Sequence, residues 1–184
     1  MSMCRNKCGF SGFCYSEHLQ SFMESTKQKG ELNCVALEQS PDTFESPDFS
    51  ADIVRWFSYG SCNGDDNTLL NVNASVLANP NQIHGIWVEP HYWVKANKIL
   101  GEIPINIVYS NKKLNTIVQS KGHVSFNLAT TKEKVAELHR EYPDAIICSK
   151  NCGECGWKCY KLYEGMVIEE INRNHGKVPV GDNE

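Results

Sequence analysis

Four cysteines lie within twelve residues near the C-terminal end of this chain, in a segment that is otherwise polar and rich in glycine. Thiolates this close together in a hydrophilic segment indicate a metal site rather than core packing, since thiolate is a soft ligand suited to zinc and to iron–sulfur clusters. Gly153 and Gly156 allow the backbone to curl, so that successive sulfur atoms converge on one centre. The predicted metal ligands are Cys148, Cys152, Cys155 and Cys159.

The spacing of this run favours iron over zinc. Four thiolates suffice either for a tetrahedral zinc ion or for a 4Fe–4S cluster. Structural zinc, however, is usually held by two separate pairs of ligands that a hairpin brings together. A single crowded run is closer to the cysteine runs of ferredoxins. We therefore expect an iron–sulfur cluster here, with zinc as the alternative metal.

A second group of three cysteines lies at the other end of the chain, directly before a predicted helix. Three thiolates leave one position of a four-iron cluster open, and an open position is what a centre needs to bind a substrate or cofactor. The partial positive charge at the start of the helix suits an anionic cluster. The alternative is a zinc site completed by His18 or Cys34. The predicted ligands of this group are Cys4, Cys8 and Cys14.

The cysteine count and the composition indicate where the protein works. The chain holds nine cysteines, and an odd number argues against a framework of disulfides. Polar residues occupy positions 4–8, where a signal peptide would need an apolar region. The longest apolar stretches, such as residues 105–109, have the length of a strand, so we expect no membrane span. The sequence thus predicts a cytoplasmic protein with reduced cysteines.

Between the two groups, strand-like and helical segments alternate, which predicts an α/β fold with crossover helices. Four or five such units are too few for a full eightfold barrel of about 250 residues. We expect a small, mostly parallel sheet or a partial (β/α) barrel. It would form a single domain over residues 1–184, with a Cys-rich loop (1–14), a βα core (15–147) and a cluster loop with a tail (148–184). The expected strands are 53–58, 83–88, 105–109, 114–118, 124–128 and 145–148, the expected helices are 15–29, 68–78, 90–100 and 130–141, and 166–171 fits either.

The two cysteine groups resemble those of a phage-encoded family related to radical S-adenosylmethionine (SAM) enzymes, over roughly residues 4–160. In that family, three cysteines end in a Cys-Tyr pair like Cys14–Tyr15, and a later run closes like Cys159–Tyr160. Residues 54–61 are similar to a strand of the family that carries an Arg and a Gly, and residues 105–110 to a later strand. The resemblance implies one or two 4Fe–4S clusters, SAM as a cofactor, and redox or radical chemistry in the host cytoplasm.

A polar loop after the strand at 53–58 is the expected cofactor-binding segment. Ligands of α/β sheets bind at the carboxyl ends of strands, where Gly60, Ser61 and Asp65 lie. Asp65 is suited to a ribose or a cation. The alternative is an ordinary turn in which Asp65 caps the next helix, with Cys62 as a structural thiol.

Other residues define the competing functions. Glu89 and His91 follow the strand at 83–88, and they are candidates for acid–base chemistry or for a packed helix start. His84, inside that strand, is expected to be an interior imidazole. A net charge of −4 gives no basic surface for nucleic acid. The substrate is then a small molecule or a protein, and the competing function is a non-enzymatic, zinc-stapled binding module.

Overall fold

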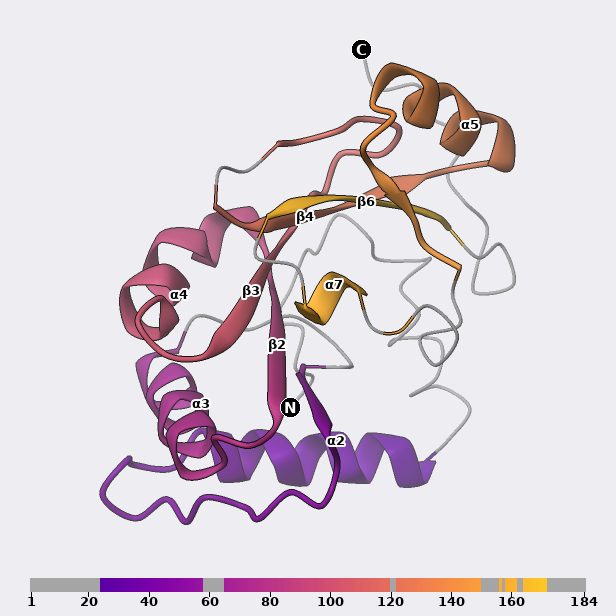
Figure 1. Cartoon of the computed structure of the whole chain (residues 1–184). Helices are drawn as coiled ribbons and strands as arrows, with labels where there is room; N and C mark the ends of the chain where they lie inside the picture. Colours follow the sequence, from indigo (N-terminus) through magenta and orange to yellow (C-terminus); the bar gives the residue numbers. More distant parts are fainter. Residues whose placement is uncertain are drawn as a thin grey trace.

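Six parallel strands form one sheet at the centre of this protein, in the order β1-β2-β3-β4-β6-β5 (Figure 1). The computed structural model describes residues 24–57, 65–119, 122–149, 156, 158–161 and 164–171. The parallel α/β fold predicted from the sequence is confirmed. The strands are β1 (Ile53–Trp56), β2 (Ile83–Val88), β3 (Ile105–Ser110), β4 (Val124–Ala129), β5 (Ile146–Ile147) and β6 (Gly165–Glu170). The helices are α2 (Glu24–Leu37), α3 (Asp66–Ala78), the 3-10 helix η1 (Pro90–Tyr92), α4 (Trp93–Leu100), α5 (Lys132–Glu141) and α7 (Lys158–Lys161).

Helices α3 and α4 cover one side of β1, β2 and β3, which we call the outer face of the sheet (Figure 1). Alternate residues of each strand point to this face, as the two-residue period of a strand requires. They meet the apolar faces of the two helices in one closed core, which is removed from water and supplies the main driving force for folding. The fully buried members of this core include Leu69, Val72, Val76, Ile86, Val88, Ala96 and Leu100.

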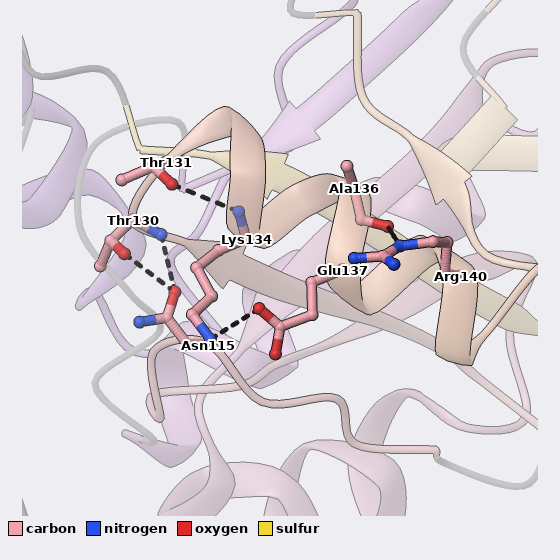
Figure 2. A network of polar contacts seen from close by, with 7 residues as sticks. All are labelled: Asn115, Thr130, Thr131, Lys134, Ala136, Glu137 and Arg140. Atoms are coloured by element: carbon pink, nitrogen blue, oxygen red, sulfur yellow. Dashed lines mark hydrogen bonds and ion pairs between the residues drawn. The ribbon is translucent and has the colours of Figure 1, made fainter.

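Helix α5 covers the outer face of the remaining strands. Val135 and Leu138, three residues apart on one side of the helix, pack against Met166 and Ile168 of β6. Thr131 caps the start of the helix, because its hydroxyl accepts a hydrogen bond from the Lys134 amide at 3.2 Å (Figure 2). Helix α5 therefore lies within two residues of the predicted bounds 130–141.

The connection between β3 and β4 differs from the other outer crossovers. Its described part, residues 111–119, contains no helix and no strand, so the strand predicted at 114–118 is wrong. Asn115 has a φ of 56°, a left-handed conformation that breaks any extended run. The Asn127 side-chain oxygen instead accepts hydrogen bonds from the Asn111 amide and the Val118 backbone, each at 3.0 Å. Hydrogen bonds to buried side-chain amides thus replace the backbone hydrogen bonds that a strand would have formed here.

The structure changes one further prediction and decides another that the sequence left open. The helix predicted over 15–29 lies outside the described residues at 15–23, and it does not stop at Gly30, because α2 runs from Glu24 to Leu37. Glu31, Leu32, Ala36 and Leu37, after the glycine, are good helix formers. The ambiguous segment 166–171 forms β6, which lies between β4 and β5 and pairs with both. No helix among the described residues is both long and apolar enough to cross a membrane.

Candidate metal centre

The path of the chain between β5 and β6 sets the location of the cysteine run. From β1 to β5 each new strand is added on the same side of the growing sheet, whereas β6 turns back and enters between β4 and β5. Parallel crossovers are right-handed, so a crossover that reverses direction must pass over the opposite face. Helix α7 accordingly lies across β2 and β3 from α3 and α4, on the inner face of the sheet (Figure 1). Ligands of open α/β sheets bind where the crossovers change face in this way.

Cys148, the first cysteine of the run, is held at the carboxyl end of β5. Its backbone amide donates a hydrogen bond to the Ile168 carbonyl at 2.8 Å, which extends the pairing of β5 with β6 by one residue. Ile146 pairs with Val167 in this register, and side chains alternate along a strand, so Cys148 faces the same side as Val167. The sheet itself therefore directs this thiol to the inner face.

Cys159, the last cysteine of the run, lies in α7. Its backbone carbonyl accepts a hydrogen bond from the side-chain amide of Asn106, with a nitrogen–oxygen distance of 2.6 Å. Asn106 belongs to β3, and two strands, β4 and β6, separate β3 from β5, which leads to Cys148. The end of the run is thus attached to the middle of the inner face.

Both cysteines pack against one apolar cluster, which we call the inner cluster. Its buried centre consists of Val108, Val124 and Val167, from three adjacent strands. The half-buried rings of Trp87 and Phe126 meet edge to face at 6.2 Å and border it. Cys148 and Cys159 are half-buried against the same residues, and no disulfide joins them.

This arrangement suits soft metal ligands. Two thiols from the two ends of a twelve-residue run share one apolar surface, next to aromatic rings that limit the access of water. Gly156, in the same run, has a φ of 65°, the left-handed conformation that glycine adopts without strain. The run therefore turns where the sequence predicted it to curl.

Most of the remaining predicted ligands lie outside the part of the chain that the structure describes. Cys4, Cys8, Cys14, Cys152 and Cys155 lie outside the described residues, as do Cys62 and the predicted cofactor residues Gly60 and Ser61. Cys34 lies in α2. Within the described ranges, no three His, Cys, Asp or Glu side chains come together as a metal site. Both metal centres accordingly remain predictions.

Asp65, the third predicted cofactor residue, caps helix α3. Its carboxylate accepts hydrogen bonds from the Thr68 amide at 2.9 Å and from the Thr68 hydroxyl at 3.1 Å. This is the role that the competing interpretation assigned to it, and it accounts for an aspartate at this position. Its contact with a cofactor stays a prediction.

Three ionisable side chains meet at the carboxyl ends of β2 and β3. Glu89, buried directly after β2, forms an ion pair with Lys112, and the same carboxylate oxygen lies 3.4 Å from Nδ1 of His91. Sequence reasoning singled out Glu89 and His91 and missed Lys112. Lys112 could have been found from its position two residues after β3. Because β2 and β3 are parallel neighbours, residues that follow these two strands lie at the same edge of the sheet.

His84 is an interior imidazole, as predicted. Its Nδ1 accepts a hydrogen bond from the Trp56 indole at 3.3 Å, so its Nε2 carries the proton and donates to the Asn79 carbonyl at 2.9 Å. Both nitrogens are satisfied in the outer core, which gives this histidine a structural role.

Comparisons of the chain with protein-family models, with curated proteins and with solved structures find no match.

Proposed function

We propose that this protein binds a 4Fe–4S cluster through its C-terminal cysteine run and uses it in redox or radical chemistry. The ligands are Cys148, Cys152, Cys155 and Cys159. A second, site-differentiated cluster is held by Cys4, Cys8 and Cys14, with SAM as the cofactor that the family resemblance implies. The substrate is a small molecule or a protein.

One observation carries the proposal: Cys148 and Cys159 lie on the same apolar cluster of the inner face. Cys148 directly follows β5 and Cys159 lies in α7, and the chain reverses its direction across the sheet between these elements before it enters β6. The segment that joins them contains the two other cysteines and two glycines. Four sulfur ligands from one such run are sufficient for one cluster.

The surroundings of the two thiols explain what the chain contributes. The inner cluster excludes water from one side of the centre, and burial and hydrogen bonding are the means by which a protein sets the potential of a cluster. When bound, the cluster supplies electrons one at a time. Glu89, His91 and Lys112 lie at the carboxyl ends of β2 and β3, where they can orient a substrate or exchange a proton with it.

Oxygen-free reconstitution with iron and sulfide tests the proposal. We expect brown protein with broad absorbance near roughly 400 nm and about four to eight irons per chain, the count for one or two four-iron clusters. Protein that stays colourless and carries stoichiometric zinc after purification would favour the zinc-stapled binding module instead.

Single substitutions then locate the iron. Cys148→Ser and Cys159→Ser are each expected to remove about four irons per chain, since each takes away one ligand of the same cluster. Cys34→Ser is the matched control, because Cys34 lies in α2 and belongs to neither predicted cluster. Full iron content in both Cys148→Ser and Cys159→Ser would show that the run does not hold the cluster.

A further inference from the structure

Asn106 is an unusual residue for its place in the sheet. It lies within β3, a central strand of a parallel sheet that is covered by helices on both faces. Such strands are normally continuous runs of apolar residues, and asparagine is depleted in strands. A half-buried amide is retained here only if hydrogen bonds compensate for the loss of water.

The partner of Asn106 is the backbone of the cysteine run. Its Nδ2 donates to the Cys159 carbonyl at 2.6 Å, across 53 residues of sequence. Cys159 lies in a four-residue helix. The last four carbonyl groups of a helix accept no hydrogen bond from amides of the same helix. Asn106 therefore satisfies a carbonyl that would otherwise depend on water.

The neighbouring strand leaves room for this contact. Gly85 of β2 stands directly beside Asn106 in the parallel register, so no side chain projects from β2 at that level. Helix α7 packs against both β2 and β3. A glycine in a strand interior often marks the close approach of another backbone. Gly85 thus leaves space for α7 against the sheet, and Asn106 holds α7 there by a hydrogen bond.

We propose that Asn106 is a positioning residue for the C-terminal cluster, an inference that rests on the proposed function. By holding the Cys159 carbonyl, its amide fixes α7 on the inner face and sets the position of the last sulfur ligand relative to Cys148. The hydrogen bond acts on the cluster through the backbone of a ligand, and groups in this position affect both metal affinity and potential.

The test compares Asn106→Leu with wild-type protein after oxygen-free cluster loading. Leucine has nearly the shape of asparagine and cannot donate a hydrogen bond. We expect iron release to a chelator to become roughly tenfold faster or more, because partners of metal ligands change affinity by about 10–100-fold. The fraction of iron that becomes labile is expected to equal the fraction lost in Cys159→Ser. The reduction potential and the electron paramagnetic resonance spectrum of that cluster are expected to shift.

Two further variants separate positioning from general stability. Asn73→Leu is the matched control, since the Asn73 amide donates to the Ile99 carbonyl at 2.8 Å and joins α3 to α4 on the outer face. It is expected to lower stability and to leave the potential and the spectrum unchanged. Asn106→Gln keeps the amide and is expected to restore a part of the slow release. If Asn106→Leu does not fold, Asn106→Ala takes its place.

The outcomes distinguish the two proposals. Wild-type protein that takes up no iron removes the proposed function and this inference with it. Wild-type protein that loads normally, together with an Asn106→Leu variant that has the same iron release, potential and spectrum, overturns the inference alone. An equal spectral change in Asn73→Leu overturns it as well.

Discussion

The two faces of the sheet are built by the same strands and are completed in different ways. On the outer face, Leu69, Ile86 and Leu100 are fully buried between helices and strands. On the inner face, the described residues give a smaller cluster, with three buried valines and a border of half-buried Trp87, Phe126, Cys148 and Cys159. Adjacent residues of one strand, such as Trp87 and Val88, belong to the two different faces.

This difference indicates what each face requires. Burial of apolar side chains accounts for the outer face, since its core is closed by residues of the chain alone. The inner cluster is small among the described residues, and its border carries thiols, which are soft metal ligands. We therefore expect the stability of the outer face to be independent of iron, and that of the inner face to increase when iron is bound.

The largest expected effect tests the outer face. Leu69→Ala removes a fully buried side chain from the contact of α3 with β1 and β2, and it is expected to lower the free energy of unfolding by about 3 kcal/mol. The loss is expected to be the same in iron-free and iron-loaded protein, as measured by urea unfolding. Leu77→Ala on the same helix is the control, because Leu77 is 57% exposed. A loss that depends on iron would contradict the division between the faces.

Much of the fold follows from local sequence patterns. The strand at 83–88 was predicted with its observed bounds, and α3 and α5 were predicted within two residues, because their caps, Asp65 and Thr131, are local signals. Gly30 misled the prediction of α2, since one glycine costs a helix only about 1 kcal/mol and does not end it. The segment 114–118 has the composition of a strand, but Asn115 is in the left-handed conformation and the Val118 amide donates to the side chain of Asn127, so the segment forms no strand.

The candidate site was predictable only where its residues are close in sequence. Cys148 and Cys159 are visible as a run. Asn106 and Lys112 are not, because their partners, Cys159 and Glu89, are distant in sequence and become neighbours only through strand order and register. The position of α7 on the inner face likewise follows from the reversal at β6, which no local pattern encodes.

A smaller effect is expected at the carboxyl ends of β2 and β3. Lys112→Met leaves the buried Glu89 carboxylate without its closest counter-charge, and we expect a loss of roughly 2 kcal/mol in the free energy of unfolding. Lys113→Met is the matched control, since Lys113 is exposed. Thermal unfolding of both variants at neutral pH provides the comparison. Equal stability of the two variants would show that the ion pair of Glu89 contributes nothing to the sheet.

The smallest effect is expected at the exposed side of α5. Lys134 lies 2.7 Å from Glu137, and its hydrogen bond and positive charge hold the pKa of the Glu137 carboxyl below its ordinary value, with a further contribution from the charge of Arg140 (Figure 2). A carboxyl whose pKa is lower in the folded state stabilises the protein above its unfolded pKa, near 4.3, and this stabilisation is lost as the pH falls through the folded pKa.

Glu137→Gln is therefore expected to be slightly less stable than wild type at pH 7. The two proteins are expected to be equally stable at a pH low enough to protonate the Glu137 carboxyl in both the folded and the unfolded state. Because both side chains of the pair are about half exposed, 1 M salt is expected to reduce the difference at pH 7, since it shortens the Debye length to about 3 Å. The same change made in a Lys134→Met background is expected to have a much smaller pH-dependent effect, because only the charge of Arg140 then acts on Glu137, as chemical denaturation at several pH values will show. A difference that survives both acid and salt would mean that Glu137 acts through packing, and the polar surface of α5 would then resemble the outer core rather than contrast with it.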